Sequence, residues 1–404
     1  MAAAVGILLL LGPALYAGIW GWLRGGIEWP GEFGALASPA PALPLAPAVE
    51  ANAAGQPPAS AVQVAGSAPL FSVVVAARDE AVVLPQLLAA LQAQTLPAAQ
   101  FEVLIADDHS ADDTAALVAA AVPPAAFGLR LVVLPAGASG KKAALAAAIA
   151  QARAAWVVCT DADCRPAPGW LAAYAARLHQ QPGLQLLSGP VRLTPGGAWF
   201  DALLGLEFAG LVGVGAGCIG RGRPTMCNGA NLAFRRAAFY EVGGYADNQG
   251  LASGDDEFLL HKLHQRYPAG VGFVAAARAV VDTPAPASLP ALLRQRVRWA
   301  SKYPHYRTAA PRQLALLVLG TNLSLAAGLG LALAWPPLAP WVAGAWALKL
   351  GADAWLLWPV LGLLQRRRWL AGLLPLQVLY APYALLVGLA GRRGGYRWKG
   401  RQVQ

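Results

Sequence analysis

The sequence predicts an α/β fold with a mostly parallel sheet, flanked by helices apolar enough to cross a membrane. Between about residues 70 and 160, short apolar runs alternate with helical segments, which is the pattern of βαβ units in a sheet covered on both faces. Long apolar segments stand at both ends of the chain. A hydrophobic content of 57%, against 13% charged residues and a mean hydropathy of +0.46, is typical of membrane proteins rather than of ordinary globular chains.

The N-terminal segment is an expected membrane anchor. Ala2 to Leu23 is a continuous apolar stretch of about one membrane thickness. It lacks a basic region before it, so we expect a retained anchor over residues 1–24 rather than a cleaved signal peptide. Arg24 at its end favours a cytoplasmic location for the residues after the anchor. Residues 35–68 are rich in alanine and proline and are predicted to be a flexible linker.

The next region, residues 70–310, is predicted to be the catalytic α/β domain. Its strands are apolar runs bounded by turn residues, and its helices are alanine- and leucine-rich. Strands are expected at 71–76, 101–106, 129–134 and 156–160, and helices at 82–94, 114–121 and 142–154.

The C-terminal region, residues 311–391, is predicted to be membrane-embedded or interfacial. Segments 314–335, 341–364 and 370–390 are each long enough to cross. Three full crossings, however, would place the basic tail (residues 392–404) and Arg366 to Arg368 on opposite sides, which the positive-inside rule opposes. We therefore expect two spans plus a third segment that dips or lies flat, and a cytoplasmic tail.

An earlier apolar stretch, residues 200–219, is interrupted by Glu207 and several glycines. We expect it to be interfacial or to face an acceptor, not to span a membrane.

The net charge of +10 suits anionic lipid headgroups or a phosphorylated substrate. Nucleic acid is a disfavoured partner, because the basic residues cluster beside apolar segments rather than along a polar face. Cys159, Cys164, Cys218 and Cys227 form no CxxC pair and have no histidine cluster near them, so we expect buried thiols in a reducing compartment and no zinc site.

Carboxylates follow three of the predicted strands. Asp161 and Asp163 end the strand at 156–160, Asp79 and Glu80 follow Arg78 after the first strand, and Asp107 and Asp108 follow the second. The carboxyl ends of parallel strands form the usual ligand crevice of open α/β sheets. Two close acids such as Asp161 and Asp163 suit a hard divalent cation that bridges phosphates.

The second acidic segment has two interpretations. Ser110 and Asp113 have the spacing of a helix capping box, which we expect them to form. A capping box does not explain the adjacent acids Asp107 and Asp108, which repel each other unless a ligand or cation compensates. The N–H and hydroxyl groups of a nucleoside would suit them.

Gly140 and Lys141 precede a strongly helical segment, where free backbone N–H groups and the helix dipole favour phosphate. A solvated turn is the alternative. The glycine spacing is not that of a Walker A loop, which disfavours P-loop ATPase chemistry.

Two further motifs contain candidate catalytic or binding residues. Asp255, Asp256 and Glu257 stand at an expected helix start, which the dipole favours, but three acids exceed what capping needs and one could be a general base. In Gln295-x-x-Arg298-Trp299, the arginine could hold a diphosphate bidentately and the tryptophan could line a sugar or acceptor pocket. A membrane-interface belt is the alternative for this motif.

In this order, the motifs resemble those of the family 2 glycosyltransferases with a GT-A fold. The resemblance covers roughly residues 70–303 and is strongest to the membrane-bound branch, which includes cellulose and hyaluronan synthases and ceramide glucosyltransferases. The basic, aromatic tail around Tyr396 and Trp398 is similar to that of ceramide-glucosyltransferase-like enzymes. Asp255 departs from the glutamate that many relatives have before the aspartate.

The resemblance implies roles for individual residues. Glu80 and Asp108 would contact the nucleoside of a UDP-linked sugar, with Arg78 and Lys141 also at the donor site. Asp161 would contact the donor sugar or diphosphate and share with Asp163 the binding of Mg²⁺ or Mn²⁺. Asp256 would be the catalytic base, with Asp255 as the alternative. Gln295, Arg298 and Trp299 would hold the diphosphate and the acceptor.

These roles imply an inverting transfer of a sugar from a nucleotide sugar to a hydroxyl of a membrane lipid-like acceptor, with the catalytic domain on the cytoplasmic face. A subunit of a processive polysaccharide synthase, with a glycan acceptor, is the alternative, disfavoured because few predicted spans remain to line a channel. A non-catalytic membrane scaffold is the second alternative, disfavoured because the four acidic positions Asp108, Asp161, Asp163 and Asp256 are all occupied by acids.

Overall fold

A computed structural model of the chain describes residues 2–29, 68–122, 125–246, 254–301, 306, 308–391, 396–398 and 401–403. Except for Ala68, the linker predicted at 35–68 lies outside the described residues, and the predicted tail is described only as the paired strands β11 (Tyr396–Trp398) and β12 (Arg401–Val403).

The centre of the α/β domain is a seven-stranded mixed sheet, which confirms the predicted fold class. Its strand order is β3-β2-β1-β4-β8-β6-β9. Strands β3, β2, β1 and β4 run parallel, whereas β8 is antiparallel to both β4 and β6. The bounds are β1 Phe71–Ala77, β2 Phe101–Asp107, β3 Gly128–Val133, β4 Trp156–Cys159, β6 Leu186–Ser188, β8 Leu232–Arg235 and β9 Val271–Phe273.

The parallel strands β1, β2 and β4 start level and run in the same direction. Phe71 at the start of β1 pairs with Phe101 of β2 and with Trp156 of β4. Every residue of β2 and β4 is buried, as expected for strands covered on both faces. The loops that come after β1, β2 and β4 therefore emerge at the same edge of the sheet.

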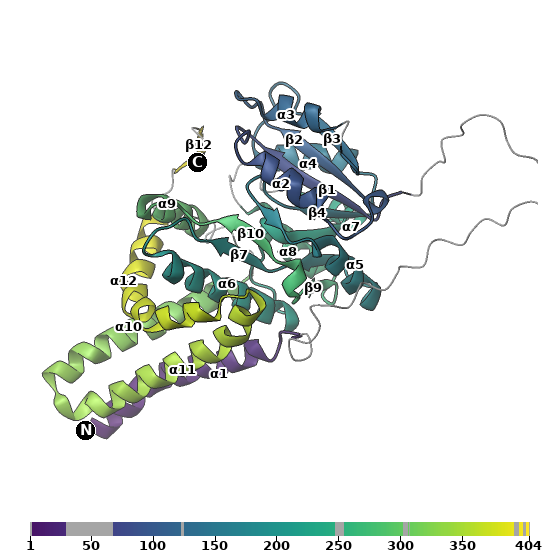
Figure 1. The fold of residues 1–404 in the computed structure, drawn as a ribbon. Helices are drawn as coiled ribbons and strands as arrows, with labels where there is room; N and C mark the ends of the chain where they lie inside the picture. Colours follow the sequence, from purple (N-terminus) through teal and green to yellow (C-terminus); the bar gives the residue numbers. More distant parts are fainter. Residues whose placement is uncertain are drawn as a thin grey trace, which may run out of the picture.

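Helices cover both faces of this sheet (Figure 1). They are α2 Leu84–Gln92, α3 Thr114–Ala121, α4 Lys141–Gln151, α5 Trp170–Gln180, α7 Arg236–Glu241 and α8 Asp255–Arg266, with short 3₁₀ turns η2 Ala98–Gln100, η3 Gly229–Asn231 and η5 Ala277–Ala279. Helix α3 has the predicted bounds. Helix α4 ends three residues before the predicted 154, because Ala152 adopts an extended conformation that leads into β4.

A second, three-stranded sheet lies between the main sheet and the apolar helices (Figure 1). Its order is β5-β10-β7, from β5 Arg165–Pro166, β7 Val191–Thr194 and β10 Val281–Pro284. Helix α6 (Asp201–Gly220) comes after β7, and α9 (Leu289–Ala300) comes after β10. Arg192 of β7 donates to the carbonyl of Leu364, at 3.0 Å, and so ties this sheet to the end of the helical region.

Helices α1 (Ala2–Arg24), α10 (Ala310–Ala334) and α11 (Ala339–Leu363) form an elongated arm (Figure 1). The start of α1 and the η7 turn (Pro336–Leu338) between α10 and α11 lie at its far end. After η8 (Arg367–Gly372), helix α12 (Leu373–Gly391) turns away from the arm and packs on α9. The chain after α11 thus returns toward the α/β domain.

Four helical segments in the described residues are long and apolar enough to cross a membrane: α1, α6, α10 and residues 367–390. Helix α11, which was expected to span a membrane, is not apolar enough to be among these four. Helix α6, expected not to span, does meet it, yet 67% of its most apolar window is buried by the protein, against 17% in α1. Its glycines are packing sites: a Cβ on Gly217 would stand 2.6 Å from the Leu23 carbonyl oxygen, and one on Gly213 would stand 2.8 Å from Val360.

The arm contains a buried ionic cluster. Lys349 of α11 donates to Asp353 one turn later at 2.6 Å and also to Gln377 of α12. The other carboxylate oxygen of Asp353 accepts the hydroxyl of Tyr16 of α1 at 2.6 Å. Charges in an apolar region are costly unless they are paired, so this cluster fixes how α1, α11 and α12 face one another.

Replacing Lys349→Leu should destabilise the protein by about 3 kcal/mol or more, because Asp353 is left buried without its counter-charge. The double variant Lys349→Leu with Asp353→Leu should recover part of that loss. Chemical unfolding of the purified protein in a fixed detergent measures both. Equal stability of the single variant and the wild type would contradict this account.

Candidate active site

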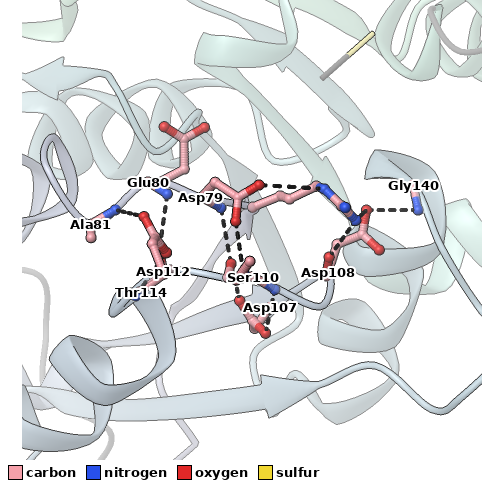
Figure 2. Close-up of polar contacts among 11 residues, drawn as sticks. Asp79, Glu80, Ala81, Asp107, Asp108, Ser110, Asp112, Thr114 and Gly140 are labelled. Carbon is pink, nitrogen blue, oxygen red and sulfur yellow. Dashed lines mark hydrogen bonds and ion pairs between the residues drawn. The ribbon is translucent and has the colours of Figure 1, made fainter. Parts of the chain in front are cut away.

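The loops after β1 and β2 bind each other through a network of polar contacts (Figure 2). The Asp79 amide donates to Ser110 Oγ at 3.0 Å, and Asp79 Oδ1 accepts the Ala111 amide at 2.7 Å. The Glu80 amide donates to Thr114 Oγ1 at 2.8 Å. Figure 2 shows the Glu80 carboxylate pointing away from these contacts. The loop backbone is therefore fixed, and Glu80 lines the cavity described below.

The predicted capping box is not formed, and the prediction was wrong. Helix α3 begins at Thr114, and the Asp113 side chain makes no cap hydrogen bond. Ser110 instead donates its hydroxyl and its amide to the Asp107 carboxylate, at 2.5 and 3.2 Å. The Thr114 amide is accepted by Asp112. These local bonds satisfy Asp107, so its buried charge stabilises the loop and needs no ligand.

Asp108 has a different environment from Asp107. It is only 2% exposed, and its Oδ2 accepts the amide of Gly140 at 2.9 Å. Arg78 donates to the Asp108 carbonyl at 2.9 Å and lies 3.7 Å from its carboxylate. Gly140 has a φ of +95°, which favours glycine at this position. The hydrogen bond between Gly140 and Asp108 joins the β2 loop to the start of α4.

Lys141, the first residue of α4, lies between acids from two other elements. Its Nζ is 2.7 Å from Asp161 after β4 and 3.4 Å from Asp255 at the start of α8. Burial opposes the charge of Lys141, but Asp161 and Asp255 more than offset this and hold its pKa well above the usual value. Lys141 therefore neutralises part of a strongly acidic site.

Asp161 and Asp163 are suited to a hard divalent cation. Together with Cys164 they offer three potential ligand atoms within 4.8 Å of one another. Burial, with Asp161 and Glu80 close by, raises the pKa of Asp163 to about 6. Burial also raises the pKa of the Cys164 thiol, which lies 3.7 Å from Asp163 Oδ1. A neutral thiol is a poor ligand for Mg²⁺ or Mn²⁺, so the two carboxylates are the fitting pair.

Asp256 is held by backbone amides at the start of α8. Its Oδ2 accepts the Gly229 amide at 2.9 Å, and its Oδ1 accepts the Glu257 amide at 2.8 Å. Gly254 precedes the helix with a φ of +86°. A Cβ on Gly229 would stand 3.3 Å from Asp255 Oδ2, so the absence of a side chain lets this turn approach both acids.

Asn231, at the end of the Asn-Gly-Ala-Asn segment, has a structural role. It is fully buried, and its Oδ1 accepts from Trp170 and Tyr174, at 2.7 and 2.8 Å. Its Nδ2 donates to the carbonyls of Pro190 and Ala279, at 2.8 and 2.9 Å. All four contacts join α5, η5 and the segment before β7, so the turn that carries Gly229 is rigidly supported.

Helix α9 brings Gln295, Arg298 and Trp299 to the same cavity. Sequence reasoning gave no role to Arg296, which is 5% exposed and donates to Glu207 of α6. The spacing could have indicated that Arg296 is buried, because Leu292 and Arg296 are four residues apart and therefore share the buried face of α9.

All the predicted site residues line one cavity of about 1010 Å³. At one end are Glu80, Asp108 and the acids around Lys141. The other end lies among the apolar helices, where α1, α6, α10, α11 and α12 contribute its walls, including Lys349 and Gln377. A single space thus joins the polar edge of the sheet to the interior of the helical region.

Comparison with known families shows that residues 72–243 match the family Glycosyl transferase family 2. The mannosyltransferase PcManGT from Pyrobaculum calidifontis, solved with GDP-Man and Mn²⁺, is similar in structure, with a TM-score of 0.54 and 19% identity over 97% of this chain and 98% of that one. This similarity concerns the fold and confirms the expected α/β GT-A-like domain with long apolar helices beside it.

Two other structures are more distant. Residues 1–349 of TarS from S. aureus give a TM-score of 0.42 and 16% identity, over 83% of this chain and 96% of that one. The glucosyl-3-phosphoglycerate synthase from Mycobacterium tuberculosis gives 0.39 and 18%, over 57% and 78%. A comparison with curated protein sequences gave no match.

Replacing Asn231→Asp should destabilise the protein by at least about 3 kcal/mol, because a second oxygen would face two buried carbonyls that now accept hydrogen bonds. Asn228→Asp is the matched control: its Oδ1 accepts the Ala230 amide, a bond that aspartate keeps. Thermal unfolding of both variants measures the difference. Equal melting temperatures would contradict the structural role of Asn231.

Proposed function

We propose that this chain, which carries a family 2 glycosyltransferase domain, transfers a sugar from a nucleotide-sugar donor to a hydroxyl of a membrane lipid-like acceptor. The observation that carries the proposal is the single cavity between the acids at the strand ends and the apolar helices. A water-soluble donor can enter at the polar end, and an apolar acceptor at the other. The cluster of Arg366, Arg367 and Arg368 after α11 supports a cytoplasmic location for the domain.

The donor end is proposed to bind the nucleoside and the diphosphate, UDP-linked as the family resemblance implies. Glu80 and Asp108 offer carboxylates to N–H and hydroxyl groups, with Arg78 holding Asp108 in place. Lys141 and Arg298 supply positive charge for the phosphates. Asp161 is the proposed contact to the donor sugar or diphosphate.

Asp161 and Asp163 are proposed to hold Mg²⁺ or Mn²⁺. When bound, such a cation neutralises charge on the diphosphate leaving group. The two carboxylates supply hard oxygen ligands, and they lie next to Lys141, which already compensates one side of the acidic site.

Asp256 is proposed to be the general base for the acceptor hydroxyl in a single inverting displacement. The hydrogen bonds that it accepts from the amides of Gly229 and Glu257 fix the orientation of its carboxylate. Asp255 is the alternative base, and its Oδ2 lies 3.4 Å from Lys141 Nζ. Trp299, packed beside Phe208 of α6, is proposed to line the acceptor side.

Removing divalent cations from the purified protein should abolish UDP-sugar turnover, and adding Mg²⁺ or Mn²⁺ should restore it. Asp163→Asn should lower kcat/KM by about a hundredfold or more, because the bound cation contributes several kcal/mol to the transition state. Asp113→Asn, the same change at an exposed acid, is the control. Turnover that persists in EDTA would disprove the metal role.

Asp256→Asn should reduce transfer by about 10²–10⁴-fold, the usual contribution of a general base, while UDP binding persists. Asp255→Asn is the comparison and should lose less. The reverse order of the two variants would make Asp255 the base.

Mass spectrometry of lipid extracts from cells with and without the protein identifies the acceptor. A new soluble polymer in place of a glycosylated lipid would exclude the lipid acceptor.

A further inference from the structure

Arg296 lies between Gln295 and Arg298 on α9, and its side chain is almost fully buried. A guanidinium stays charged at all ordinary pH, and burying a charge is costly unless it is paired and hydrogen-bonded. The contacts that offset this cost therefore show what the residue holds in place.

On one side, Arg296 binds the two apolar helices next to α9. Its Nη2 donates to Glu207 of α6 at 2.5 Å, and its Nε donates to the hydroxyl of Tyr383 of α12 at 3.0 Å. The Tyr383 hydroxyl also lies 3.4 Å from the other oxygen of Glu207. Three helices thus meet at a single buried ion pair.

On the other side, Arg296 holds two residues that line the cavity. Its Nη1 donates to Gln295 Oε1 at 3.1 Å, and its guanidinium lies 4.3 Å from the centre of the Trp299 ring. Because arginine can only donate, Gln295 must turn its amide oxygen toward Arg296. The amide nitrogen, with its two donors, is then the end available to an anionic ligand in the cavity.

We propose that Arg296, held by Glu207 and Tyr383, is a positioning residue that orients the Gln295 amide for the donor diphosphate and the Trp299 ring for the acceptor side. This inference rests on the proposed function. A hydrogen-bond donor that is already oriented loses little conformational freedom when the ligand binds. Most of the free energy of its hydrogen bond then contributes to affinity. The helices that wall the apolar end of the cavity are thereby linked to the diphosphate end through one side chain.

The test compares the dissociation constants of UDP and UMP, which share the nucleoside and differ by the β-phosphate. Arg296→Lys keeps the charge but cannot hold Glu207, Tyr383 and Gln295 together. It should weaken UDP binding about tenfold and UMP binding less than twofold, since a hydrogen bond to a charged phosphate is lost. Tyr383→Phe keeps the ring and should shift the same ratio in the same direction by about two- to threefold.

Arg130→Lys is the matched control. Arg130 also donates to a buried glutamate, Glu102, at 2.9 Å, but at the opposite end of β2 from the cavity. It should leave the UDP-to-UMP ratio unchanged. An equal loss of both ligands in Arg296→Lys, or no loss, would overturn the positioning role.

The outcomes also separate this inference from the proposed function. If the wild type binds GDP rather than UDP, the same comparison is made with GDP and GMP. If it binds no nucleoside diphosphate, the proposed function fails and the positioning role fails with it. Wild-type binding with an unchanged ratio in both variants refutes the positioning role alone.

Discussion

The parallel register of β1, β2 and β4 is the constraint on which the site depends. Because these strands run in the same direction, the loops after them leave the same edge of the sheet and bring acids distant in the sequence into one place. Gathered carboxylates repel one another, and the protein compensates for this with Lys141, which contacts Asp161 and Asp255. The position of Lys141 at the start of α4 is in turn fixed by the contact between Gly140 and Asp108.

Buried charges fix how the apolar helices and α9 face one another. The pair of Arg296 and Glu207 joins α9 to α6, and the cluster around Lys349 and Asp353 joins α11 to α1 and α12. Both are paired and hydrogen-bonded, as charges in a largely apolar environment must be. Because each pair has directional bonds, it specifies how neighbouring helices face one another, which apolar packing alone does less sharply.

Much of the candidate site could be anticipated from residue type and spacing. Glu80, Asp108, Asp161, Asp163 and the α9 motif all line one cavity. Strand ends could be predicted because they are the points where apolar runs stop. The wrong capping prediction arose because two local partners compete for the same hydroxyl. Ser110 has the spacing of a capping residue, but its hydroxyl is taken by Asp107. Asn231 had no predicted role, and its four side-chain bonds go to distant parts of the chain.

The sequence by itself determined the alternation of strands and helices, the acids at the strand ends and the long apolar helices, because period and composition are local properties. Tertiary structure alone decided how α6 packs and which residues pair with Arg296. The glycines of α6 read as interruptions, but the helix is continuous and they admit Leu23 and Val360 at close range. Arg296 had no predicted role, and only the approach of Glu207 and Tyr383 makes its burial favourable. The two contacts of Arg296 join residues 87 and 89 positions apart, and no local pattern encodes these partners.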